Sequence, residues 1–105
     1  MIKVSGTITK VFDILKFKKS DGSIFEKRLF WLEDKSDKYP NEYQMELWLS
    51  DCSMLDNYKV GDYVTTYIDL KGKKWEKDGK EGITNTLKCW NIEKDGVAFK
   101  EIKTS

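Results

Sequence analysis

The chain has 105 residues and a mass of 12.3 kDa, which is enough for one domain with a modest core and too little for two. Charged residues make up 35% of it and aromatic residues 13%, but the net charge of +1 does not by itself favour a nucleic-acid partner. Two cysteines and no histidine argue against a zinc site, a disulfide scaffold and catalysis by a histidine base, so no metal and no cofactor is expected.

No run of about 18 apolar residues is present, and the first ten residues lack the apolar segment and cleavage site of a signal peptide. A cytoplasmic protein without a membrane span is therefore expected. Residues 1–105 are predicted to form a single domain, with a core at about residues 2–93 and a short extension at 94–105.

Runs of β-branched and aromatic residues alternate with turn signals and predict five strands. The first covers about residues 2–17 and needs a bend, for which Gly6 is the candidate. A turn at residues 20–23 leads to the second strand at about 24–33. A loop containing the only proline then leads to the third strand, at about 43–50.

A short helix is predicted after the third strand, with Asp51 as its cap and with Met54 and Leu55 turned inward. The fourth strand covers about residues 63–75. A lysine-rich loop separates it from the fifth strand, at about 82–93. This order predicts an all-β protein, a five-stranded OB-fold barrel with a short helix between strands 3 and 4. An SH3-like barrel is the main alternative, although it usually lacks that helix.

The third strand alternates between two faces. Its hydrophobic side is formed by Tyr43, Met45, Leu47 and Leu49. Trp48 falls on the opposite side with Gln44 and Glu46, where a strand with one buried face meets water. In the second strand, Trp31 points outward if Phe30 and Leu32 point into the barrel.

The ligand surface of an OB-fold is the outer face of strands 2 and 3, flanked by the loops joining strands 1 to 2 and 4 to 5. Both of those loops are basic here, and the segment of residues 71–80 holds five lysines against two acids. The acidic residues are concentrated at about 33–42. The predicted contact residues are Trp31, Trp48, Trp75, Lys18, Lys19, Lys27, Lys73, Lys74 and Lys77.

Aromatic rings and lysines in one groove suit single-stranded nucleic acid. Stacking on a ring is tolerant of sequence and contributes about 1 to 3 kcal/mol per base, and lysines add salt-dependent affinity for phosphates. Each tryptophan also has a structural alternative: Trp31 in the core, Trp48 under a neighbouring strand or subunit, and Trp75 capping the barrel end. Trp90 is expected in the core, and the pattern around it requires a β-bulge.

Several short motifs together resemble a known family of small proteins. They are Val4-Ser5-Gly6-Thr7-Ile8, Phe30-x-Leu32-Glu33, Tyr39-Pro40, Glu46-x-Trp48, Val60-Gly61-Asp62, Trp75 and Lys88-x-Trp90-x-Ile92. The family, of unassigned function, is found in Bacteroidetes bacteria and their phages, and it resembles bacterial single-stranded DNA-binding proteins in its OB-fold. The resemblance covers about residues 2–93. It implies an OB-fold, a bacterial host cell and binding of single-stranded DNA.

The chain departs from this resemblance at two points. Trp31 stands where an aliphatic residue is expected. The tail KEIKTS lacks the acidic, Phe-ended tip through which bacterial single-stranded DNA-binding proteins recruit partners, so recruitment by that route is not expected.

The leading hypothesis is a non-enzymatic, sequence-tolerant single-stranded DNA-binding protein acting in bacterial or phage replication or recombination. The second is an OB-fold module for protein interaction, or a phage accessory or structural component, in which the exposed tryptophans are interface hot spots. An enzyme using paired carboxylates is a third class, but no Asp/Glu pair is set in an identifiable pocket. RNA is an alternative ligand, because stacking and lysine contacts do not test for the 2′-hydroxyl. The sequence leaves open a homo-oligomer.

Overall fold

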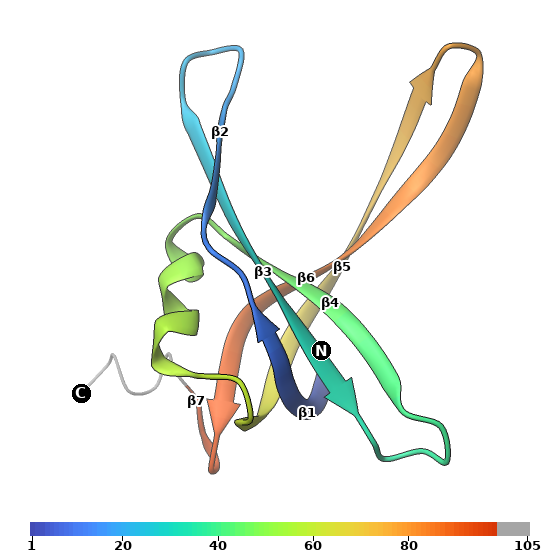
Figure 1. Ribbon diagram of the computed structural model, residues 1–105. Coiled ribbons are helices and arrows are strands. Elements are labelled where there is room, and N and C mark those ends of the chain that lie inside the picture. Colours follow the sequence, from blue (N-terminus) through green and yellow to red (C-terminus); the bar gives the residue numbers. More distant parts are fainter. Residues whose placement is uncertain (99–105) are drawn as a thin grey trace.

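In the computed structural model, which describes residues 1–98, five long strands close into a barrel (Figure 1). They are β1 (Ile2–Val11), β3 (Ile24–Asp34), β4 (Asn41–Trp48), β5 (Tyr63–Lys77) and β6 (Lys80–Lys94). The order is β1-β5-β6-β4-β3, and additional pairing of β1 with β3 closes the sheet. Only β4 and β6 pair in parallel among these strands. The predicted five-stranded barrel is confirmed.

The first predicted strand is two strands in the structure. β1 continues through Gly6 and ends at Val11, and the chain resumes as β2 (Leu15–Lys18). Directly after Gly6, at Thr7, the pairing of β1 passes from β5 to β3. A Cβ at that glycine would overlap the backbone carbonyl of Glu33, so Gly6 lets β1 pass close to β3 where the barrel closes.

The helix between β4 and β5 is the 3₁₀ helix η1 (Leu49–Asn57). Its N-cap is Trp48 and no side chain caps it, so the predicted Asp51 cap is wrong; Asp51 lies in the first turn. Met54 and Leu55 are buried as expected. Leu49 is 51% exposed because the chain leaves the strand there with a φ of 53°.

The core lies inside the barrel and under η1. Its fully buried side chains include Ile8, Phe30, Leu32, Met45, Leu47, Cys52, Met54, Leu55, Val64, Ile68, Cys89 and Ile92. Phe30 and Leu32 of β3 point inward, so Trp31 between them points outward.

A β-bulge is present in β6, as the sequence pattern required. Tyr67 pairs with Asn91 and Ile68 pairs with Cys89, which makes Trp90 the extra residue. Trp90 is half-buried and lies outside the core cluster, with its ring 5.4 Å from that of Tyr67. Its expected place in the core is wrong, because the bulge lets Cys89 and Ile92 fill the core instead.

Two hairpin arms project from the same side of the barrel and diverge (Figure 1). The first is formed by β2 and the start of β3, joined by the predicted turn at residues 20–23. The second is formed by the distal parts of β5 and β6. The lysine-rich segment predicted as a loop is mostly strand, and the turn consists of Asp78 and Gly79, with φ values of 53° and 77°. Asp-Gly is a preferred sequence for such a tight turn.

The extension after the barrel begins as a strand. β7 (Val97–Ala98) pairs with the end of β6. The tail KEIKTS lies outside the described residues. Within residues 1–98, no helix has the length and apolar character needed to cross a membrane.

Candidate nucleic-acid interface

One continuous face extends from the outer side of β3 and β4 onto the second arm. Trp31 lies opposite Gln44 in the register of β3 and β4, and Glu46 lies opposite Lys88 in the register of β4 and β6. Residues in register point to the same side of a sheet. We call the following residues the candidate face: Trp31, Gln44, Glu46, Trp48, Lys71, Lys73, Trp75, Thr84, Thr86 and Lys88.

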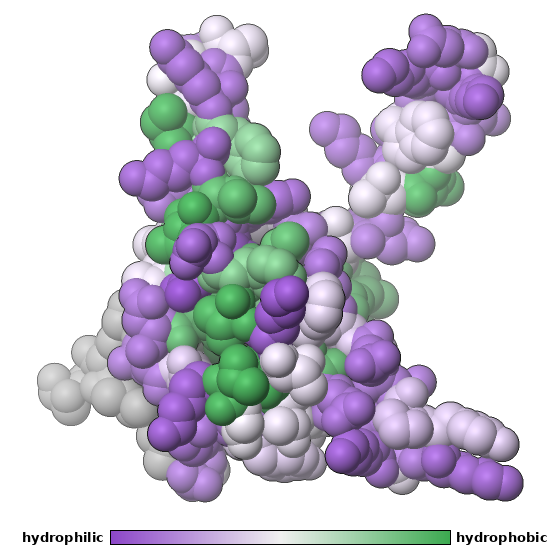
Figure 2. All heavy atoms as spheres, in the orientation of Figure 1, coloured by the Kyte–Doolittle hydropathy of each residue, from purple (hydrophilic) through white to green (hydrophobic). Residues whose placement is uncertain are grey.

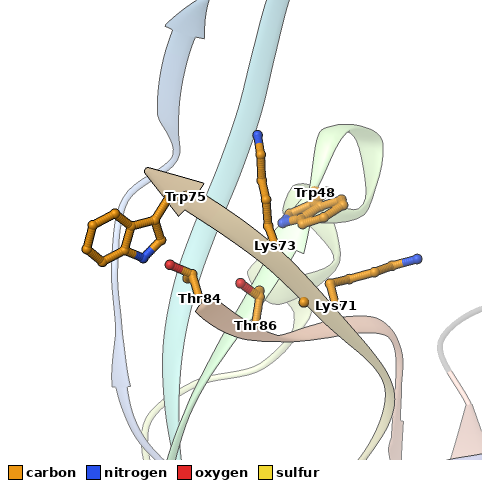
Figure 3. Close-up of a pocket in the computed structure, with 7 residues that line it drawn as sticks. Trp48, Lys71, Lys73, Trp75, Thr84 and Thr86 are labelled. Carbon is orange, nitrogen blue, oxygen red and sulfur yellow. The ribbon is translucent and has the colours of Figure 1, made fainter. Parts of the chain in front are cut away.

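A hollow of about 470 Å³ lies where Trp48 meets the second arm. Trp48 comes from β4, Lys71, Lys73 and Trp75 come from alternate positions of β5, and Thr84 and Thr86 come from β6. Figure 3 shows Lys73 projecting between the two indole rings. The space between the two arms is open in the space-filling view (Figure 2). The hollow therefore offers aromatic, cationic and hydroxyl groups to a ligand entering between the arms.

Trp75 is held across the second arm by its pairing with Gly82. A Cβ on Gly82 would lie only 2.6 Å from Cζ2 and 2.8 Å from Cε2 of the indole. The ring therefore occupies the space above a glycine that has no side chain. Trp75 is still 46% exposed, so part of its ring is accessible for stacking.

Trp48 is half-buried and held by three neighbours. Its Nε1–H donates to Oε1 of Glu46 at 3.0 Å. The ring of Phe25 meets it edge to face at a centroid distance of 5.6 Å, and Nζ of Lys88 lies 4.9 Å from its centroid. These contacts fix the orientation of the indole and place positive charge beside it.

Trp31 forms a second aromatic position farther along the face and is 40% exposed. Its Nε1–H donates to Oε1 of Gln44 at 3.0 Å. Phe12 meets it edge to face at 5.4 Å, and Nζ of Lys10 lies 4.9 Å from its centroid. Trp31 and Trp48 thus share one arrangement: an oriented indole, an aromatic neighbour and a lysine.

The predicted lysines of the second arm divide between its two sides. Lys73 lines the hollow. Lys74 alternates to the other side, where its Nζ lies 3.5 Å from Glu76 and 3.3 Å from Glu81. Lys77 pairs with Lys80 at the tip.

The predicted lysines of the first arm are also placed differently from one another. Lys27 lies opposite Trp48 in the register, with its Nζ 3.8 Å from Glu46. Nζ of Lys19 lies 5.4 Å from the ring centroid of Phe25. Lys18 is exposed and paired with Ile24, which puts it on the side of the arm opposite the paired Phe17 and Phe25.

The acidic segment at about residues 33–42 lies away from the hollow, whereas Glu46 belongs to the candidate face beside Trp48. The turn between β3 and β4 is flanked by Asp34 and Glu42, and it points away from both arms (Figure 1). A hydrogen bond from the Ser36 backbone holds the pKa of Asp34 below its usual value. The charge asymmetry predicted from the sequence is thus present along the face.

Several residues of this surface were missed by sequence reasoning: Lys10, Phe12, Phe17, Phe25, Lys71 and Lys88. The Asp-Gly pair at the tip of the second arm was the available signal for Lys71, because it predicts a hairpin whose strands extend the face. Phe25 shares the alternation of Lys27 and Trp31. No comparable signal marks Lys10 or Phe12, which reach Trp31 only through the closure of the barrel by β1.

Solved structures with the same architecture include two single-stranded DNA-binding proteins and a domain of replication protein A. The mitochondrial protein Rim1 of S. cerevisiae aligns with a TM-score of 0.61 at 18% identity, over 90% of this chain and 92% of that one. The second OB-fold domain of replication protein A from Methanococcus maripaludis aligns with a TM-score of 0.57 at 14% identity, over 89% and 81%. The small single-stranded DNA-binding protein of Streptomyces coelicolor aligns with a TM-score of 0.50 at 15% identity, over 90% and 92%.

These likenesses confirm the predicted OB-fold. No curated protein sequence matches the chain. A family model does match, over residues 3–93, which is nearly the whole barrel. The chain belongs to the family described as a domain of unknown function, DUF3127.

Proposed function

We propose that this protein binds single-stranded DNA, with bases stacked on Trp31, Trp48 and Trp75 and phosphates held by lysines. The observation that supports this most is the presence of all three rings on one continuous face, with Trp48 and Trp75 lining its hollow. Stacking on exposed indoles requires unpaired bases, since a base inside a duplex is already stacked on both sides. Relatives of the same fold, from S. cerevisiae and Streptomyces coelicolor, are described as single-stranded DNA-binding proteins, which agrees with the proposal.

The lysines of the candidate face supply affinity without reading sequence. Lys71 and Lys73 extend from the wall of the hollow, and Lys88 lies beside Trp48 (Figure 3). Positive groups at these positions would release counterions from the DNA backbone. The protein acts as a non-enzymatic, sequence-tolerant binder in DNA replication or recombination in the bacterial cytoplasm, alone or as a homo-oligomer.

A protein partner is the second candidate, favoured by the other side of the second arm. Leu70 and Ile83 are 62% and 69% exposed there, and Leu70 is paired with the half-buried Leu87. Exposed apolar residues on a two-stranded arm are typical of a surface that another chain covers.

Titration of tryptophan fluorescence with single-stranded and duplex oligonucleotides at two salt concentrations tests the proposal. Single strands should quench the emission, and a duplex of the same sequence should bind at least about tenfold more weakly, because its bases cannot stack on the indoles. Affinity should fall steeply with salt. Equal affinity for the two forms would refute stacking, and salt-independent association with a protein would favour the second candidate.

The Trp90→Phe variant should keep the quenching, since Trp90 lies outside the candidate face. The same titration with an RNA strand of matching sequence measures the preference for deoxyribose over ribose.

A further inference from the structure

Glu46 is a negative charge in the middle of a face proposed to bind a polyanion. It lies opposite Leu29 of β3 on one side and opposite Lys88 of β6 on the other, two positions before Trp48. Its side chain is only 17% exposed. A carboxylate at this position repels phosphates, and its partial burial costs free energy. Both effects are unfavourable in a DNA-binding protein unless the charge contributes to the recognition of the ligand.

The hydrogen bond that orients the Trp48 indole does not require the negative charge of Glu46. Oε1 of Glu46 accepts the Nε1–H of Trp48 at 3.0 Å. Gln44 does the same for Trp31, also at 3.0 Å, with a neutral amide. Gln44 accepts from the neighbouring strand and Glu46 from the same strand, but both accept an indole N–H through Oε1 at 3.0 Å, so a glutamine at position 46 can accept the same hydrogen bond.

The second oxygen of Glu46 is open to a ligand. The ion pair with Lys27, at 3.8 Å, is also made through Oε1. Across residues 1–98, no group donates a hydrogen bond to Oε2. A partly buried acceptor without a donor therefore lies at the edge of the indole on which a base is proposed to stack.

We infer that Glu46 reads the base stacked on Trp48 and selects bases with an exocyclic amino group. Cytosine, adenine and guanine each present an amino group that can donate to a carboxylate, and pairing of Glu or Asp with N4 of cytosine is an established mode of readout. Thymine presents carbonyl oxygens at the corresponding positions, which a carboxylate repels. The inference rests on the proposed function and adds a base preference to a binder that otherwise tolerates sequence.

The test compares oligo(dC) with oligo(dT) of equal length, at pH 7.5 and fixed salt, on the wild-type protein and Glu46→Gln. Both ligands are pyrimidines, so ring size is matched. Wild type should bind oligo(dC) about five- to tenfold more tightly than oligo(dT), near the lower end expected for a base-reading pair. Glu46→Gln keeps the acceptor for Trp48 and loses the charge. It should therefore bind oligo(dT) more tightly than wild type does, with the ratio between the two ligands falling to within about twofold.

Asp37→Asn is the matched control, because it changes the charge equally in the exposed turn between β3 and β4, at the opposite end of β4 from Trp48. It should change affinity for both ligands together and leave their ratio unchanged. A wild-type ratio near one, or a ratio that survives in Glu46→Gln, would overturn the base reading while leaving DNA binding intact. Failure of both oligonucleotides to bind would overturn the proposed function itself.

Discussion

The indole of Trp75 lies across Gly82 in the neighbouring strand, so close that a methyl group on that glycine would fall 2.6 Å from a ring carbon. Trp75 forms one wall of the hollow, and its ring can occupy this place only because Gly82 has no side chain. This contact explains how a ring on a two-stranded arm, with solvent on both sides, keeps a defined orientation. A substitution at Gly82 should therefore displace the Trp75 ring while leaving Trp75 itself unchanged.

Gly82→Ala should weaken binding of single-stranded DNA as much as Trp75→Ala does, by up to the value of one stack, about 1 to 3 kcal/mol. The fold should persist, because alanine is no worse than glycine in a strand. Gly72→Ala is the control on the same arm, since its nearest neighbour would be Oδ1 of Asn85 at 3.6 Å, an ordinary contact. Fluorescence titration measures all three variants. Equal behaviour of the two glycine variants would contradict the dependence of the Trp75 ring on Gly82.

Lys73 and Lys74 are adjacent, but we expect them to contribute differently. Lys73 lines the hollow, whereas Lys74 is held on the other side by Glu76 and Glu81. Lys73→Ala should reduce the slope of log affinity against log salt by about 0.7, the value of one phosphate contact on a single strand. Lys74→Ala removes the same charge and should change the slope by much less. Equal slopes for the two variants would place the DNA elsewhere on the arm. Neither variant should change the ratio of affinities for different bases.

Trp48 and Leu47 are neighbours on opposite faces of β4, and their truncation should separate binding from stability. Trp48→Ala should cost about 1 to 3 kcal/mol in binding and less in stability than Leu47→Ala, because the indole is only half-buried. Leu47 is fully buried, so Leu47→Ala should cost about 2 to 5 kcal/mol in the free energy of unfolding and leave the affinity of the folded protein unchanged. Thermal denaturation and titration of each variant provide the two measurements. Identical behaviour would show that the alternation of β4 does not separate core from ligand surface.

Cys52 should be unreactive in the folded protein. Burial, with a smaller contribution from the Glu26 charge, raises the pKa of its thiol to about 11, and the thiol donates to the carbonyl of Leu47. At pH 8 a thiol-specific reagent should modify it only after unfolding, since the thiolate is the reactive form. Rapid labelling of the native protein would contradict this burial.

The same pKa shift predicts the direction of a pH effect on stability. The unfolded thiol ionises above about pH 9 while the folded thiol stays protonated up to about pH 11, so rising pH favours unfolding across this window. Below pH 9 both states are protonated and Cys52 contributes no pH dependence. Cys52→Ala should be less stable overall but lose less stability than wild type between pH 9 and 11. Denaturant unfolding at a series of pH values measures the difference.

The alternation of hydrophobic and polar residues along each strand was sufficient to predict much of the barrel. Alternation in β3 and β4 placed Phe30, Leu32, Met45 and Leu47 in the core and Trp31 and Trp48 outside it, because a strand turns successive side chains to opposite faces. The lysine-rich loop predicted between the fourth and fifth strands was wrong. The segment after Leu70 has no hydrophobic period, yet it forms a long hairpin because Asp78 and Gly79 make a tight turn.

The sequence by itself determined the succession of strands along the chain, the helix after β4 and the outward side of Trp31 and Trp48, since these follow from periodicity and turn residues within each segment. Tertiary structure alone decided which side chains meet across segments. Closure of β1 on β3 brings Lys10 and Phe12 to Trp31. The bulge at Trp90 and the contact of Trp75 with Gly82 depend on register between strands, and register is set by packing of the whole barrel rather than by any one strand.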